Sequence, residues 1–236
     1  MHWSEPEVDY REFRLCKLKE PRFAHLYLLL YWPIYGLLFL FVERFYQVKS
    51  YTPMHCFLDD LVPFNELFLI PYLFWFVYLV GMLVYTLFQD VDCFRRLMRF
   101  LILTYSVAII AYLLFPTCQN LRPTDFPREN FLVDFIRHFY AFDTNTNVCP
   151  SIHVLGSLAV MFASWHCKGI TGKGWKAAFT VCGLLISIST VFMKQHSCLD
   201  VLAAIPISLF AYWYCFCRAE GTWKRKHKDP VGESGV

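Results

Sequence analysis

Six long apolar runs constrain this chain more than any other feature of its sequence. They cover residues 24–42, 64–88, 98–115, 151–165, 175–193 and 198–217. A helix needs about 20 mainly apolar residues to cross a bilayer, and five of the runs have roughly that length. The run 151–165 is shorter, but its long neighbours favour a span there as well. The sequence therefore predicts an all-α polytopic membrane protein, a bundle of six transmembrane helices.

The composition agrees with this fold class. Hydrophobic residues make up 57% of the 236 residues, more than a soluble domain of this size buries in one core. The ten cysteines form no Cys-x-x-Cys pair and lie mostly in apolar runs, as small hydrophobic residues do. One membrane domain, residues 24–217, is predicted between two cytoplasmic tails, residues 1–23 and 218–236. Lys and Arg outnumber Asp and Glu by only 22 to 19, which gives no basis for a nucleic-acid partner.

Basic residues alternate between the two sides of the predicted bundle. Sixteen of the 22 Lys and Arg residues lie before the first run, after the last, or in or beside the second and fourth connections. Lys and Arg in short flanking segments favour the cytoplasmic side of a membrane. Both termini are therefore predicted to be cytoplasmic, and the other connections to face the non-cytoplasmic side.

The longest connection, residues 116–150, contains a short amphipathic helix pattern. Phe131, Phe135, Ile136 and Phe139 repeat at helical spacing with polar residues between them. The segment is too short to span a membrane. It is interpreted either as an interfacial helix that covers a site opening to the lipid, or as a helix merely packed on the bundle.

Two polar clusters open the fourth and the sixth run, and both are predicted to face the non-cytoplasmic side. The first is CPSIHV, residues 149–154, and the second is KQHSCLDV, residues 194–201. Ionisable groups near hydrocarbon are costly, so such clusters are functional candidates. Each residue also has an ordinary interpretation: Ser151 as a helix cap, Lys194 as an interfacial anchor, and either histidine as a polar anchor.

The second cluster has the spacing of a catalytic histidine with an orienting acid. His196 and Asp200 are four residues apart, which places two side chains on one face of a helix. A carboxylate bonded to one ring nitrogen fixes the tautomer, so the other nitrogen can act as a nucleophile. In the first cluster, Ser151 and the free amides of a helix start suit an anion, with His153 beside it. If the two starts meet, one imidazole can attack phosphorus while the other protonates the leaving oxygen.

These clusters resemble motifs of the type 2 phosphatidic acid phosphatase superfamily. Its members are metal-independent lipid phosphatases and lipid phosphotransferases built on a six-helix core. The Pro-Ser-x-His motif of the superfamily is complete in Pro150, Ser151 and His153. The resemblance covers most of the chain.

The other two motifs of the superfamily are matched in part. In Lys-x6-Arg-Pro, Arg122 is present, but Phe115 stands in the Lys position. In Ser-Arg-x5-His-x3-Asp, the Ser, His and Asp match, but Thr190 stands in the Arg position. Lys194 lies two residues before His196, and the sequence Lys-Gln-His there resembles the version of this motif in the inositol phosphorylceramide synthase-like branch.

The resemblance implies a role for each of six residues. His196 would be the nucleophile, Asp200 its orienting partner and His153 the general acid, while Arg122, Ser151 and Lys194 would hold phosphate oxygens. It implies no metal and no cofactor. The implied activity is hydrolysis of a membrane lipid phosphomonoester or diphosphate, phosphatidic acid-like or isoprenyl, through a phosphohistidine. The alternatives are transfer of a phospho-headgroup to ceramide or diacylglycerol, and a non-catalytic membrane protein on the same fold.

Overall fold

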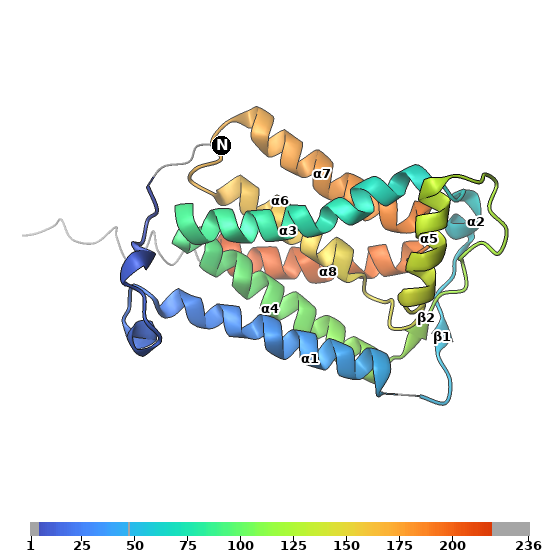
Figure 1. Cartoon of the computed structure of the whole chain (residues 1–236), viewed down its shortest axis with the longest axis horizontal. Coiled ribbons are helices and arrows are strands. Elements are labelled where there is room, and N and C mark those ends of the chain that lie inside the picture. Colours follow the sequence, from blue (N-terminus) through green and yellow to red (C-terminus); the bar gives the residue numbers. More distant parts are fainter. Residues whose placement is uncertain (1–4, 47, 219–236) are drawn as a thin grey trace, which may run out of the picture.

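The computed structural model describes residues 5–46 and 48–218, and this part of the chain is mainly helical (Figure 1). The helices are α1 (Tyr31–Arg44), α2 (Phe57–Leu61), α3 (Leu69–Gln89), α4 (Val91–Leu114), α5 (Phe131–Phe142), α6 (Ile152–His166), α7 (Lys173–Phe192) and α8 (Cys198–Tyr212). A 3-10 helix, Ala24–Leu30, leads into α1, and a π-helical turn, Trp213–Cys217, extends α8. Two short strands, β1 (Thr52–Pro53) and β2 (Thr117–Cys118), pair in parallel. The expected C-terminal tail lies outside the described residues except for Arg218.

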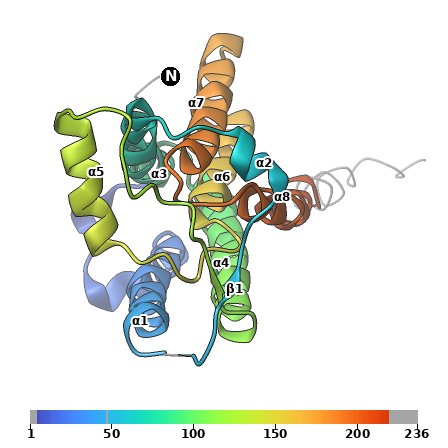
Figure 2. The same ribbon diagram turned by 90° about the vertical axis from the view of Figure 1, so that its right-hand side faces the viewer.

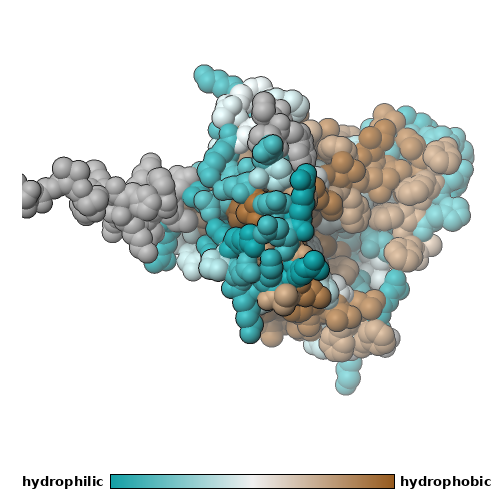
Figure 3. Space-filling model, turned by 60° about the vertical axis from the view of Figure 1, so that its left-hand side comes forward, coloured by the Kyte–Doolittle hydropathy of each residue, from teal (hydrophilic) through white to brown (hydrophobic). Residues whose placement is uncertain are grey.

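Five helical segments are long and apolar enough to cross a membrane. They are Ala24–Arg44, Glu66–Gln89, Val91–Leu114, Lys173–Phe192 and Cys198–Cys217. Figure 3 shows hydrophobic side chains along the flank of the bundle and hydrophilic ones gathered at the end nearest the viewer. This is the surface expected when lipid tails surround the flank and water meets the end.

The fourth apolar run, residues 151–165, forms α6, which is shorter than the five helical segments above. Its 15 residues rise about 22 Å, less than the roughly 30 Å of hydrocarbon in a bilayer. It packs against α3, α4, α7 and α8, and Leu155, Ala159, Val160 and Ala163 are fully buried. The other helices thus shield α6 over most of its length.

Gly156 lets neighbouring aromatic side chains approach α6 closely. A Cβ at this position would lie 2.6 Å from the Tyr105 hydroxyl and 2.9 Å from Nε1 of Trp75. No real side chain fits at such distances. The glycine therefore allows Trp75 to pack beneath the first turn of α6, where His153 lies.

The N-terminal segment, predicted as a tail, contacts the bundle through Glu7 and Tyr10. The Glu7 amide donates to the Phe88 carbonyl at 2.9 Å, and the Glu7 carboxylate accepts from the Val91 amide at 2.7 Å. The Tyr10 hydroxyl donates to the Leu87 carbonyl at 2.9 Å. These contacts fasten the segment to the turn between α3 and α4.

The amphipathic segment forms α5, which lies across the end of the bundle where α6 and α8 begin (Figures 1 and 2). The Asn130 side chain caps it by accepting from the Val133 amide at 3.1 Å. Val133 and Ile136 are fully buried, whereas Phe131 is 80% exposed. The helix therefore packs on the bundle with one face and leaves aromatic side chains on the other.

Candidate active site

The starts of α6 and α8 meet at the end of the bundle beside α5. Ser151 caps α6 and Ser197 caps α8. The Ser151 amide donates to the Asp200 carbonyl at 3.3 Å, which joins the two helix starts through the backbone. Residues from two clusters far apart in the sequence are brought together in this way, as the sequence analysis required.

His196 and Asp200 form a hydrogen-bonded pair. Nδ1 of His196 lies 3.2 Å from Oδ2 of Asp200, whose side chain is fully buried. The same oxygen accepts from the Ser197 amide at 2.9 Å. Because Asp200 holds Nδ1, the Nε2 lone pair of the neutral ring remains available for chemistry.

The pair does not arise in the way its spacing suggested. Its residues do not share a helix face, because His196 precedes the cap of α8 and lies outside the helix. Asp200 instead occupies the third position of α8, and its carboxylate turns back to the Ser197 amide in a capping box. The same turned-back carboxylate reaches the ring of His196.

His153 lies in the first turn of α6 between two aromatic rings of α3. Its ring centroid is 4.5 Å from that of Tyr72 and 4.5 Å from that of Trp75. The His196 ring lies 6.0 Å away. Within the described part of the chain, the buried Nδ1 of His153 has no hydrogen-bond partner. Packing alone therefore fixes the ring plane.

Both histidines line one small polar pocket of about 60 Å³. Its other lining residues are Phe39, Glu43, Tyr72, Tyr112, Asp143, Thr144, Thr146, Asn147, Val148, Ile152 and Gln195. A pocket of this size has room only for a small group. The start of α6, two imidazoles and several side-chain hydrogen-bonding groups thus surround one small space.

Two carboxyl groups of this pocket, Glu43 and Asp143, are not marked by any motif in the sequence. Glu43, at the end of α1, accepts hydrogen bonds from the Thr144 hydroxyl and, at 3.0 Å, from Nδ2 of Asn147. Burial raises the pKa of Asp143, an effect that Arg122 opposes. The only sequence signal was an acidic residue at the end of the first run and the polar stretch 143–147.

Arg122 lies behind the pocket and does not line it. Its terminal nitrogens donate to the carbonyls of Tyr140 and Thr144 at 3.0 and 2.9 Å, and to Oε1 of Gln195 at 2.6 Å. Its Nη1 also donates to the Asp143 carbonyl at 3.0 Å. Arg122 thus ties the end of α5 to the segment that carries His196, and its terminal nitrogens contact protein acceptors.

Lys194 and Ser151 do not line the pocket either. Nζ of Lys194 donates to the carbonyls of Asp59 and Val62 at 2.7 and 2.5 Å, so the ammonium points to the end of α2 and away from the pocket. Ser151 is fully buried, and its hydroxyl accepts from the Val154 amide at 3.5 Å. The ordinary interpretation of Ser151 as a helix cap accounts for its contacts.

Cys149 lies close to the histidine–aspartate pair but is a poor competing nucleophile. Burial, together with the nearby Asp200 carboxylate, raises the pKa of this thiol to about 12. At neutral pH the thiol therefore stays protonated, and the thiolate is the nucleophilic form of cysteine.

No model of a protein family, no curated protein and no solved structure matches this chain.

Proposed function

We propose that this chain is a six-span membrane lipid phosphatase of the type 2 phosphatidic acid phosphatase superfamily. It hydrolyses a lipid phosphomonoester or diphosphate through a phosphohistidine. The observation that carries the proposal is the pair of histidines, 6.0 Å apart at one pocket, of which only His196 has a carboxylate on its Nδ1. A pair of unlike imidazoles at one site is the arrangement that a nucleophile and a general acid require.

The two histidines take different roles in this reaction. Nε2 of His196 attacks phosphorus, the bond from phosphorus to the lipid oxygen breaks, and protonated His153 gives its proton to that oxygen. Asp200 stabilises the positive charge that develops on the His196 ring. A water molecule then attacks the phosphohistidine while His153 accepts its proton, which releases inorganic phosphate and restores both rings.

The groups proposed to hold the phosphate differ from the three that the resemblance implies, because of the contacts at the site. The first-turn amides of α6, at Ile152 and His153, have no partner within the helix, and the helix dipole favours an anion there. Nε2 of Gln195 has no hydrogen-bond partner among the described residues and lies at the pocket. Arg122 holds Gln195 in place and adds positive charge behind it. Lys194 is not part of this revised set.

An apolar groove at the same end of the bundle supports a lipid substrate. The groove has a volume of about 390 Å³ and is lined by residues of α2, α6, α7 and α8. Val154 and Cys198, which line it, follow His153 and His196 by one and two residues. The groove thus offers an acyl chain an apolar surface that begins beside the starts of α6 and α8.

Release of phosphate from lipids in detergent or vesicles tests the proposal. Purified protein should release inorganic phosphate from at least one of phosphatidic acid, lysophosphatidic acid or isoprenyl diphosphate, and excess EDTA should leave the rate unchanged. Among the described residues, the histidines and carboxyl groups of the pocket do not form a cluster of three close enough to share one metal ion. New phospholipid in place of free phosphate, when ceramide or diacylglycerol is added, would identify a phosphotransferase. No product above that of the His196→Ala protein would refute both enzymes.

The proposed orientation puts both termini in the cytoplasm and the histidines on the opposite side. Sixteen of the 22 basic residues then belong to cytoplasmic segments, as the positive-inside rule requires. Alkaline phosphatase fused after Lys173 should stay inactive in cells, whereas a fusion in the 116–150 connection should be active. The reverse pattern would contradict the orientation, and equal activity of both fusions would contradict a span at α6.

A further inference from the structure

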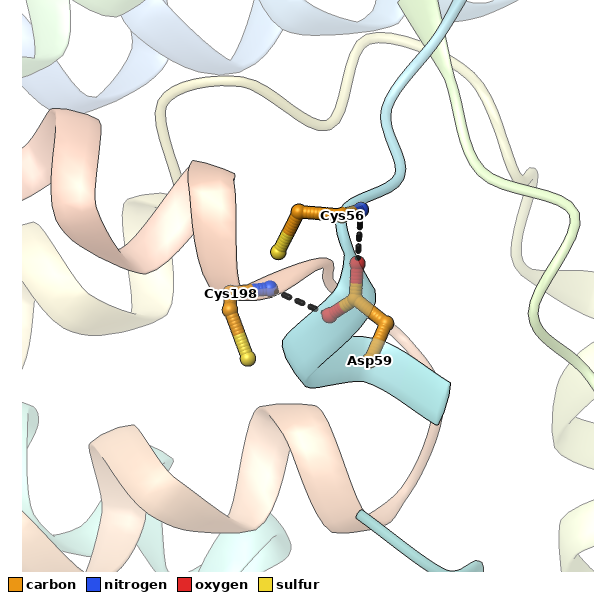
Figure 4. A group of neighbouring side chains, drawn as sticks. All are labelled: Cys56, Asp59 and Cys198. Atoms are coloured by element: carbon orange, nitrogen blue, oxygen red, sulfur yellow. Dashed lines mark hydrogen bonds between the residues drawn. The ribbon is translucent and has the colours of Figure 1, made fainter. Parts of the chain in front are cut away.

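The short helix α2 is fastened to the start of α8 by one buried carboxylate (Figure 4). Asp59 accepts from the Ser197 hydroxyl at 2.6 Å and from the Cys198 amide at 2.7 Å. It also accepts from the Cys56 amide at 2.8 Å, which closes the first turn of α2. Hydrogen bonds from Ser197, Cys198 and Cys56 outweigh the effect of burial and lower the pKa of Asp59. Asp59 is therefore ionised at neutral pH and joins two segments distant in sequence.

Two thiols lie beside this carboxylate, one from each segment. The sulfur atoms of Cys56 and Cys198 and a carboxylate oxygen of Asp59 all lie within 4.8 Å of one another (Figure 4). Both cysteines are partly exposed. Since α2 has only five residues and packs at the outside of the bundle, a small shift of it would bring the sulfur atoms into bonding distance.

The hydrogen bonds of Asp59 favour a bond between the thiols over a metal ion. Each of its two oxygens already accepts at least one hydrogen bond from the protein. A metal ion bound by Cys56, Asp59 and Cys198 would compete with those bonds for the carboxylate. A disulfide between the two thiols leaves all three hydrogen bonds intact.

A second thiol pair lies at the opposite end of the bundle. Cys93, in the first turn of α4, and Cys167, just after α6, are near Asp90 in a cluster of the same size. All three residues are buried. In the proposed orientation this end faces the cytoplasm, where thiols stay reduced, whereas Cys56 and Cys198 face a compartment that permits disulfides.

We propose that Cys56 and Cys198 form a disulfide that locks α2 onto the start of α8, an inference that rests on the orientation within the proposed function. Each thiol loses a proton and an electron as the sulfur–sulfur bond forms. A disulfide of a thiol oxidoreductase or of an oxidised small thiol takes up these two protons and two electrons and is reduced to two thiols. The bond reinforces the Asp59 contacts and holds the segment of Lys194 and His196 in place.

Disulfide mapping tests the proposal directly. Cells should be quenched in acid, and the protein should be denatured in the presence of N-ethylmaleimide so that every free thiol is alkylated. The protein is then digested without reductant. The expected product is one peptide pair joining Cys56 to Cys198, lighter by two hydrogens than the two thiol peptides together. Both cysteines alkylated, or Cys93 joined to Cys167 instead, would overturn the proposal. The same holds if both thiols resist alkylation in the native protein until a chelator is added.

Thermal unfolding gives a second measurement on the whole protein. Reductant should lower the Tm of the wild type by about 5–10 °C, the effect of losing a cross-link that closes a long loop. The Cys56→Ser protein should start at the lower Tm and not respond to reductant. Cys16→Ser, which removes an exposed cysteine away from both pairs, should behave as the wild type. An equal response of Cys56→Ser and wild type would contradict the disulfide.

The mapping does not depend on turnover. A cross-linked protein that releases no phosphate would refute the proposed function alone, and an active protein with free Cys56 and Cys198 would refute the disulfide alone.

Discussion

Replacing His196 with alanine should reduce phosphate release by roughly 10⁴–10⁶-fold, the loss expected when a covalent nucleophile is removed. Its Nδ1 is held by Asp200 at 3.2 Å, so the ring presents Nε2 as the attacking atom. Rapid quench with an activated aryl phosphate, followed by mass spectrometry under basic conditions, should find phosphate on His196 of the wild type. An intermediate that persists in His196→Ala, or phosphate on His153, would overturn the assigned roles.

A matched histidine variant separates this effect from general damage. His138 lies on α5, where its Nδ1 is 2.7 Å from the Asp134 carbonyl, and it does not line the pocket. His138→Ala should therefore keep near wild-type activity. A comparable loss in both variants would show that the assay does not report on the nucleophile.

Asp200→Asn should slow formation of the phosphohistidine by roughly 10²–10⁴-fold. The amide can still accept from the Ser197 amide, which preserves the cap of α8. It cannot supply the negative charge that stabilises the developing His196 cation. If Asp200→Asn formed the intermediate at the wild-type rate, the carboxylate would be only a helix cap.

The helices could be predicted because their signal is local. Each apolar run is long enough that its composition alone indicates a helix, and the structure has helices at all six. The largest difference is at the run 98–115, whose helix begins seven residues earlier, at Val91. The short helix α5 was also recoverable, since its stripe of apolar residues repeats at helical spacing. The short length of α6 could also be read from the sequence, but its shielding by four neighbouring helices could not.

The polar contacts of the site could be predicted only where partners are close in sequence. His196 and Asp200 are four residues apart and do pair, although capping of α8 and not a shared helix face is the reason. Glu43 meets Thr144 and Asn147 across about a hundred residues, a contact that no spacing rule contains.

The hydrogen-bond partners of the basic residues could not be predicted from the sequence either. Sequence position suggested that Arg122 and Lys194 face a phosphate, because both lie beside matched motifs. Most of their hydrogen bonds go to backbone carbonyls: those of Tyr140, Asp143 and Thr144 for Arg122, and those of Asp59 and Val62 for Lys194. Such carbonyls at helix ends need donors, and nothing in a sequence marks which side chain will supply them.

The aromatic neighbours of His153 are important for the design of its variant. Alanine would leave a cavity between Tyr72 and Trp75, so a loss of activity could come from collapse of the site. Glutamine fills more of that space and retains hydrogen-bonding groups but cannot transfer a proton at neutral pH. His153→Gln is therefore the informative replacement, with an unchanged Tm as the check that the fold is kept.

His153→Gln should lower phosphate release from a lipid phosphate by roughly 10²–10⁴-fold, the usual contribution of a general acid. The lipid alkoxide is a poor leaving group and needs the proton. A nitrophenyl phosphate has a leaving group that departs without protonation, so phosphorylation of His196 should return to within about tenfold of the wild-type rate. Rapid-quench measurement of the phosphohistidine with both substrates checks this. Equal losses with the two substrates would mean that His153 acts through binding or packing. The proton would then have to come from another group at the pocket. Asp143 is the best candidate, because its raised pKa favours the protonated carboxyl group.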